Sequence, residues 1–203
     1  MKNFIAKMGA VLIVLMAVSA SYAGTMKDRR DGKTYKTVKI GKQVWMAENL
    51  NYQTGESKCY RNEPENCGKY GRLYFWREAV TACPDGWHLP SKEEFEELEK
   101  LAGQKAGDID EAGTVLKSTT GWKNEDGKSG NGINGLGFGA LPAGFYASDD
   151  DYFYYEGHNA YFWSSTEYDS FNAYFLYLFY NDEGADVDTS DKYGAFSVRC
   201  VKN

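Results

Sequence analysis

The sequence predicts an α+β domain with an antiparallel sheet, and three features of the chain lead to this prediction. A β-hairpin pattern comes first, two short amphipathic helix patterns follow it, and a long glycine-rich loop then leads into several strand patterns. Helices and strands that are segregated along a chain favour α+β over an alternating α/β fold. With 203 residues, 42% of them hydrophobic and 16% aromatic, the chain can build one packed domain.

The first residues have the layout of a signal peptide. Lys2 and Lys7 supply positive charge, residues 9–18 are apolar, and Ala23 ends a short stretch that suits a signal peptidase. The apolar run is shorter than the roughly 20 residues that span a bilayer. The predicted organisation is a cleaved signal peptide over 1–23, a short amino-terminal segment over 24–30 and a single domain over 31–203.

The charge of the chain excludes several classes of partner. A formal net charge of −6 argues against nucleic acid, because phosphate neutralisation needs a basic face. It also argues against adhesion to anionic lipid. No segment after the signal peptide is long and apolar enough to predict a membrane span. We therefore expect an exported protein that resides in the periplasm, on the cell surface or in the medium.

The four cysteines, Cys59, Cys67, Cys83 and Cys200, predict disulfides, since an even count is typical of an exported chain. Four cysteines allow three pairings. Cys59 and Cys67 bracket a polar loop, which favours a local bridge and leaves Cys83 with Cys200. The alternative is a zinc site, but zinc usually takes closely spaced cysteine pairs, and the sequence has none. We expect no metal and no cofactor.

The opening of the domain predicts a hairpin. Residues 33–40 alternate in polarity, as a first strand would, and residues 40–43 suit a tight turn. Residues 44–46 are the expected second strand. Residues 49–71 lack periodicity and are expected to form a loop held by its own bridge.

Two helices are predicted next. Apolar residues within 73–83 recur at spacings of three and four, which indicates a helix with one buried stripe that includes Leu73 and Val80. Ser91 and Glu94 form a capping box, which predicts the start of a second helix. Gly103 is its expected end.

The remainder of the domain predicts a loop and strands. Glycines crowd residues 127–144, where Leu136, Phe138 and Leu141 can anchor an irregular loop. The expected strands are residues 160–166, 173–180 and 195–201, with a turn over 181–184.

Several motifs resemble known families. Trp76-x-x-Ala79-x-x-x-Cys83, followed by Gly86-Trp87-His88-Leu89-Pro90-Ser91, resembles the two-helix opening of C-type-lectin-like domains. A larger set is similar to the Fibrobacter succinogenes major paralogous domain family: Val44–Leu50, Cys83–Pro90, Leu116–Trp122, Phe138–Gly144, Trp163–Glu167 and Ser197–Val201.

This resemblance implies an exported bacterial protein with a C-type-lectin-like core, but it implies no established activity. It also implies a bridge from the first helix, at Cys83, to the final strand, at Cys200. The triplets that bind calcium and sugar in C-type lectins have no match here, since Trp163 is followed by two serines. Calcium-dependent sugar binding of that type is therefore not implied.

Half of the Phe, Tyr and Trp residues lie between residues 145 and 180, and they predict a binding surface. The tyrosines at 152, 154 and 155 adjoin three aspartates, so not every ring can be buried. Exposed rings beside carboxylates suit sugars, whose C–H faces stack on the rings, and they also suit protein partners. The candidate ligand-binding residues are Tyr152, Tyr154, Tyr155 and Trp163. Residues 173–180 are expected to serve sheet packing instead.

The predicted function is therefore a non-catalytic module that binds a polysaccharide or an envelope protein. Two alternatives are a structural envelope protein and an oxidase related to formylglycine-generating enzymes, which need reactive cysteines for copper. No catalytic residue is predicted. His88 is expected to be a structural histidine that donates to the backbone, because no nucleophile or acid is spaced to partner it.

Overall fold

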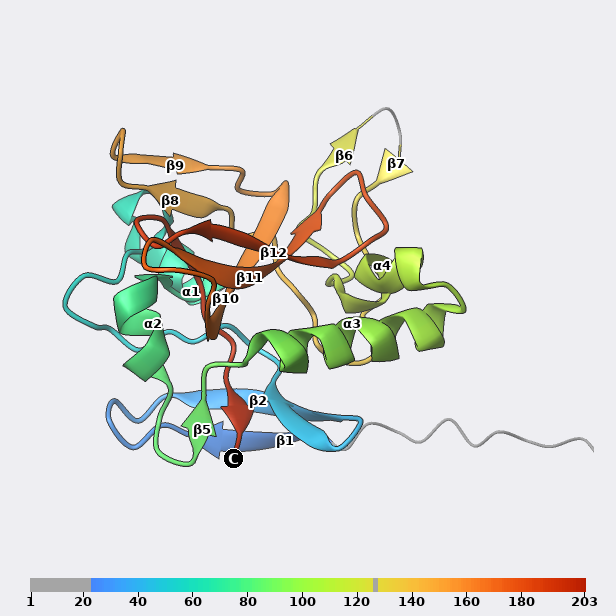
Figure 1. Cartoon of the computed structure of the whole chain (residues 1–203), viewed down its shortest axis with the longest axis horizontal. Helices are drawn as coiled ribbons and strands as arrows, with labels where there is room; N and C mark the ends of the chain where they lie inside the picture. Colours follow the sequence, from blue (N-terminus) through green and yellow to red (C-terminus); the bar gives the residue numbers. More distant parts are fainter. Residues whose placement is uncertain (1–22, 126–127) are drawn as a thin grey trace, which may run out of the picture.

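A computed structural model describes residues 23–125 and 128–203, and it confirms the α+β class. The predicted signal peptide lies outside the described residues except for Ala23. Two main sheets make up most of the domain, and helix α3 (Lys92–Ala106) lies between them (Figure 1). No helix within the described ranges is long and apolar enough to cross a membrane.

The smaller main sheet joins the two ends of the described chain. Its strand order is β1-β2-β3-β14-β5, and all its pairs are antiparallel. The strands are β1 (Ala23–Lys27), β2 (Thr34–Ile40), β3 (Gln43–Met46), β14 (Val201–Lys202) and β5 (Trp87–His88). The predicted hairpin is confirmed as β2–β3. The amino-terminal segment over 24–30 contributes β1 to the same sheet.

The larger sheet has the order β12-β11-β10-β13-β8-β9, with β4 also paired to β13. Its strands are β4 (Leu73–Phe75), β8 (Phe145–Ala147), β9 (Tyr152–Tyr154), β10 (Asn159–Glu167), β11 (Asn172–Phe179), β12 (Asp186–Asp191) and β13 (Ala195–Ser197). The pair β10–β13 is parallel, and the other pairs are antiparallel. A separate small hairpin pairs β6 (Asn124–Glu125) with β7 (Lys128–Ser129).

The start of α3 is confirmed and its predicted end is wrong. Ser91 accepts a hydrogen bond from the Glu94 amide, and the Glu94 side chain accepts one from the Ser91 amide. Gly103 stays inside the helix, which ends at Gly107 with a φ of 98°. A Cβ on Gly103 would lie 2.7 Å from the Cα of Ile109, so this glycine serves close packing.

The first predicted helix is shorter than expected. Residues 73–75 form β4, which pairs with β13, and helix α2 covers Trp76–Ala82. Val80 is partly exposed, while Ala79 and Ala82 are buried. The predicted buried stripe was therefore wrong at Val80. The helix is shorter than predicted because pairing of residues 73–75 with a distant strand overrides local periodicity.

Among the described residues, four further helical segments occupy regions that were expected to be loop or were not assigned. Helix α1 (Pro64–Tyr70) and the short turn η1 (Tyr60–Asn62) lie inside the predicted loop over 49–71. Helix α4 (Ala112–Leu116) follows the short turn η2 (Ile109–Glu111) after α3.

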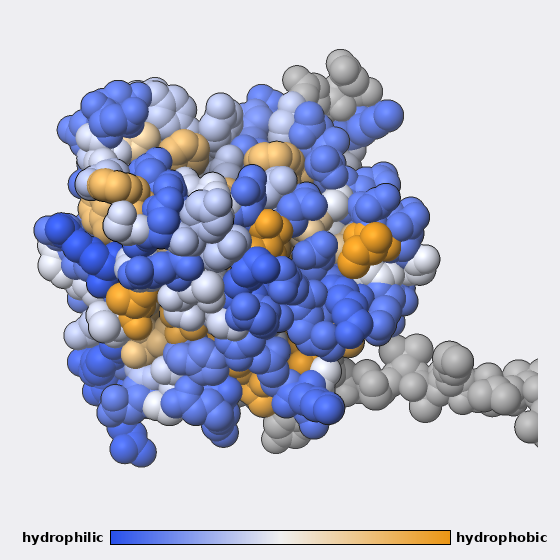
Figure 2. All heavy atoms as spheres, viewed as in Figure 1, coloured by the Kyte–Doolittle hydropathy of each residue, from blue (hydrophilic) through white to orange (hydrophobic). Residues whose placement is uncertain are grey.

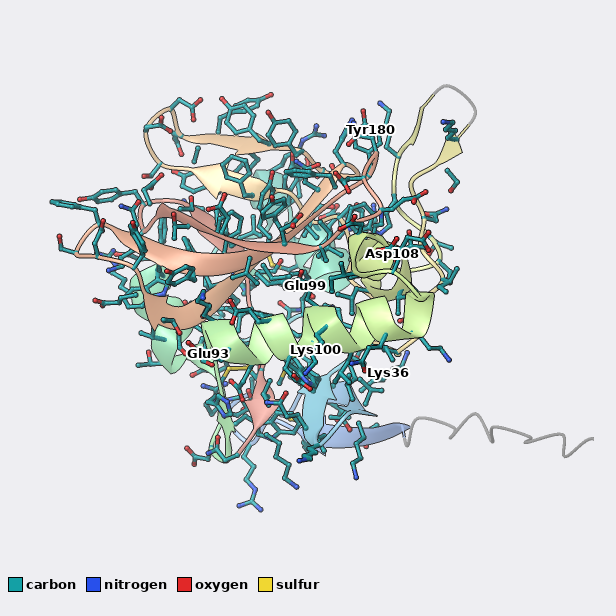
Figure 3. All side chains as sticks on the ribbon, turned by 45° about the vertical axis from the view of Figure 1, so that its right-hand side comes forward. Lys36, Glu93, Glu99, Lys100, Asp108 and Tyr180 are labelled. Atoms are coloured by element: carbon teal, nitrogen blue, oxygen red, sulfur yellow. A yellow bond between two sulfur atoms is a disulfide. The ribbon has the colours of Figure 1, made fainter. Side chains whose placement is uncertain are left out.

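The main core lies on both sides of α3. Phe95, Leu98 and Ala102 of this helix share one buried cluster with Trp45 of the smaller sheet and Phe162 of the larger sheet. Figure 3 shows Glu99 on the side of α3 that faces the larger sheet, and Lys100 on the side of Lys36. Burying apolar area on both faces makes the helix the centre of the fold.

The carboxyl-terminal chain connects the two sheets. The predicted strand over 195–201 is divided into β13 and β14, because residues 198–200 cross from one sheet to the other. Both predicted disulfides are present: Cys83–Cys200 with an S–S distance of 2.05 Å, and Cys59–Cys67 with 2.04 Å. In the glycine-rich loop, Phe138 is fully buried in the main core, as expected of an anchor.

Candidate functional site

An aromatic groove opens between the β8–β9 hairpin and the connection from β12 to β13. Its volume is about 830 Å³. In Figure 1 this hairpin lies at the end of the larger sheet away from β6 and β7. The residues that line the groove are Phe145, Ala147, Ser148, Asp149, Asp150, Tyr154, Tyr155, Tyr161, Phe175, Ser190, Asp191, Tyr193, Gly194 and Phe196.

Strand alternation builds the floor of the groove. Tyr161 lies opposite Tyr177, and Trp163 lies opposite Phe175, so these four rings share one face of the β10–β11 pair. The intervening residues of both strands, such as Phe162, enter the core around α3. One face of the sheet therefore packs against the helix, and the other face presents aromatic rings.

Phe145 is the centre of this aromatic surface. Its ring centroid lies 5.3 Å from that of Tyr161 and 5.8 Å from that of Phe196, both in edge-to-face geometry. It stacks on Tyr154 at 5.6 Å and contacts Tyr155 at 6.0 Å. These separations are typical of favourable ring pairs, so the rings hold one another in place.

Hydrogen bonds fix the hairpin wall. The hydroxyl of Tyr146 donates to Asp151 Oδ1 at 2.7 Å, and the hydroxyl of Tyr154 donates to the Asp150 carboxylate. The bond to Asp150 raises the pKa of Tyr154 to about 12, so this phenol stays protonated. Tyr155 has a φ of 64°, a conformation that is uncommon for an aromatic residue.

The groove carries acidic side chains. Asp149, Asp150 and Asp191 belong to its lining, and within the described part of the chain no Lys, Arg or His does. On its floor, burial raises the pKa of Tyr161 to about 12, and the amide of Asn159 donates to its hydroxyl at 2.6 Å. The groove thus combines ring faces, hydroxyl groups and carboxylate acceptors.

Comparison with known proteins places the chain in a family. The model of the Fibrobacter succinogenes major domain matches residues 38–202, from within β2 to β14. The chain belongs to this family. No curated protein and no solved structure gives a match.

The four predicted ligand residues of this Fibrobacter succinogenes major domain fall into three groups by their position relative to the groove. Tyr154 and Tyr155 line the groove. Tyr152 is 59% exposed and lies on the rim, with its ring centroid 5.0 Å from that of Tyr154. The prediction that Trp163 is an exposed contact residue is wrong, because its exposed fraction is zero. The ring of Phe196 covers it at a centroid distance of 4.1 Å.

Trp163 has a structural role beneath the floor. Its indole N–H donates to the backbone oxygen of Tyr74 at 2.8 Å, which satisfies its one polar group inside the core. It lies on the same face of β10 as Tyr161, but strand β13 places Phe196 above it. The neighbouring strand, rather than the sequence around Trp163, decides its burial.

Sequence reasoning missed five rings of the groove: Phe145, Tyr161, Phe175, Tyr193 and Phe196. Phe175 was attributed to ordinary sheet packing, yet it also lines the groove. The alternation of aromatic residues at 175, 177 and 179 was the available signal, because three successive aromatic residues on one strand face differ from the aliphatic residues of a usual core face.

His88 lies outside the groove. Its Nε2 is 2.9 Å from the Glu94 carboxylate and its Nδ1 is 2.6 Å from the side-chain oxygen of Asn203. The expected backbone partner was therefore wrong, and the partners are side chains. Among the described residues, no group of three or more His, Cys, Asp or Glu side chains is arranged to hold a metal ion.

Proposed function

We propose that this Fibrobacter succinogenes major domain is an exported, non-catalytic module that binds polysaccharide in the aromatic groove. The observation that supports this function is that aromatic rings and carboxylates line the same open groove, which has a volume of about 830 Å³. Ligand sites are typically concave and mostly apolar, with a few polar groups that orient the ligand.

The chemistry of the lining suits a sugar. The partly exposed ring of Tyr155 can stack on the C–H face of a pyranose. The carboxylates of Asp149 and Asp191 can accept hydrogen bonds from sugar hydroxyls, and bonds to charged acceptors are stronger than neutral ones. Because the floor rings already contact one another, little ordering is needed when a ligand binds.

The sheet topology and one disulfide support a specific fold for the domain. We assign the domain to the C-type-lectin-like fold. Two features support this assignment: the first and last strands, β1 and β14, belong to the same sheet, and Cys83 is bridged to Cys200. Export is supported by the two disulfides, which persist in oxidising compartments.

A structural envelope protein is the second candidate, favoured by exposed rings outside the groove such as Tyr152 and Tyr168. On the face shown in Figure 2, hydrophilic residues predominate and the residues of highest hydropathy form small separate patches. The oxidase alternative requires thiolates, and all four cysteines are paired.

A glycan array, probed with the disulfide-bonded protein with and without calcium, tests the proposal. We expect the protein to bind without calcium. The variants Tyr154→Ala and Tyr155→Asn should each weaken binding about tenfold, as loss of a central aromatic contact usually does. Asparagine is chosen at 155 because it tolerates positive φ. Tyr168→Ala is the matched control, since Tyr168 is exposed and does not line the groove.

Two results would contradict the assignment. If both groove variants bind as tightly as the unmodified protein, the groove is not the site. If no glycan binds but purified cell envelopes retain the protein, the structural candidate is favoured instead.

A further inference from the structure

A second pocket, here called the side pocket, adjoins the aromatic groove. Its volume is about 570 Å³, and it shares the wall residues Ser148 and Tyr193 with the groove. Its other lining residues are Glu56, Phe75, Trp76, Arg77, Glu167, Ser170, Phe171 and Lys192. The ring of Tyr193, which is 64% exposed, therefore belongs to both spaces.

The side pocket also presents aromatic rings. The indole N–H of Trp76 donates to the backbone oxygen of Ser164 at 2.8 Å, and Lys192 Nζ lies 4.5 Å from the ring centroid. Phe171 is 64% exposed, and its backbone oxygen accepts from the Lys192 amide at 2.9 Å. The segment that carries Tyr193 is thereby tied to the turn that carries Phe171.

The charges of the side pocket are paired within the protein. Lys192 Nζ lies 3.5 Å from Glu167 Oε1, and Arg77 pairs with Glu56. The groove next to it is acidic. A polyanion would meet like charge in the groove and, among the described residues that line the side pocket, no unpaired cation, so charge complementarity disfavours an anionic polymer.

We infer that the two spaces are subsites of one binding site and that its occupant is a linear, uncharged polysaccharide bound along its length. This inference rests on the proposed function and specifies its ligand class. A ring stands in each subsite and Tyr193 stands where they meet, which is the arrangement that consecutive sugar units of one chain can use. A single terminal sugar would fill only one of the two volumes.

Calorimetric titration with oligosaccharide ladders tests the inference. The probes are β-1,4-linked oligomers of glucose, xylose and N-acetylglucosamine, from the disaccharide to the hexasaccharide, together with an oligogalacturonide of matched length. For at least one neutral ladder, affinity should rise about tenfold or more with length, because each added contact is made within an already bound chain. The oligogalacturonide should bind at least about tenfold more weakly than the neutral hexamer.

Variants separate the two subsites. Phe171→Ala should lower hexasaccharide affinity about tenfold and change disaccharide affinity much less, and Tyr193→Ala should lower both. Both rings are 64% exposed, so their loss should leave the thermal unfolding midpoint unchanged. Tyr168→Ala, outside both spaces, should leave every affinity unchanged.

The inference is overturned if affinity does not rise with length, or if Phe171→Ala binds the hexasaccharide normally. Disaccharide binding that still depends on Tyr154 would then preserve the proposed function. If no oligomer of any length binds, the inference fails, and the glycan array with the groove variants decides the proposed function separately.

Discussion

Arg199 donates two hydrogen bonds to the side-chain oxygen of Asn49, at 2.6 Å from Nη2 and 3.1 Å from Nε, across a sequence separation of 150 residues. The arginine is fully buried, and burial lowers its pKa to about 9, which leaves it protonated at neutral pH. It also donates to the backbone oxygen of Phe138, and its guanidinium carbon lies 4.3 Å from the centroid of the Phe138 ring. One buried cation thus joins the final crossover, the glycine-rich loop and the segment after β3.

Replacement of Asn49 should destabilise the domain strongly. Asn49→Leu keeps a similar volume but removes the acceptor of two Arg199 bonds and the donor to the backbone oxygen of Tyr70, so a buried charge and a buried carbonyl both lose partners. We expect a loss of about 3 kcal/mol in the free energy of unfolding. Denaturant titration measures it, with Asn51→Leu, at a partly exposed neighbouring position, as the control. Equal stability of the two variants would show that Arg199 does not depend on Asn49.

The two disulfides should contribute unequally. The Cys83–Cys200 bridge closes a loop with a separation of 117 residues, whereas the Cys59–Cys67 bridge closes one of 8. In the chain-entropy treatment the expected losses on replacement by serine pairs are about 5 and about 2.5 kcal/mol. Thermal unfolding of both double variants checks this order. The reverse order would mean that the long bridge does not restrain the unfolded chain as assumed.

Glu99 should make stability fall with rising pH. Partial burial, together with repulsion from Asp186 and Glu96, raises the pKa of its carboxyl group above 4.5. The folded state therefore binds the proton more tightly than the unfolded state, so this contribution is fully present below pH 4.5 and is lost as pH rises through the folded pKa.

Glu99→Gln should consequently stabilise the domain at neutral pH by roughly 0.5 kcal/mol and have little effect near pH 4. Thermal unfolding across this pH range measures the difference. Glu97→Gln is the control: it removes an exposed ion pair with Lys100 and should give no such gain. A gain for Glu99→Gln that does not depend on pH would contradict the electrostatic explanation.

Gly144 should be required for the hairpin wall of the groove. Its φ is 64°, and a Cβ at this position would lie 2.1 Å from the backbone oxygen of Tyr154. Gly144→Ala should therefore cost about 1–3 kcal/mol and displace the tyrosines of the wall, with about tenfold weaker binding of any groove ligand.

The matched control is Gly86→Ala. Gly86 also has a positive φ, of 79°, but its Cβ would meet no atom within 4 Å. This variant carries the backbone strain without the collision, so it should bind normally and lose less stability than Gly144→Ala. Equal losses in the two variants would assign the whole effect to backbone strain.

Local signals in the sequence determined the hairpin and the capped start of α3, and they favoured the short Cys59–Cys67 bridge. The capping box of Ser91 and Glu94 uses atoms only three residues apart, so its bonds form wherever the helix forms. The density of rings beside aspartates likewise indicated the tyrosines that line the groove, Tyr154 and Tyr155.

Tertiary structure decided what these local signals could not. Residues 73–75 became a strand because β13 pairs with them, and Trp163 became buried because Phe196 covers it. The groove likewise brings together β8, β10, β11, β13 and the turns beside them, which are separate in sequence. Periodicity reports which face of an element a side chain occupies, but whether that face is covered depends on contacts with distant segments, and these arise only when the whole chain packs.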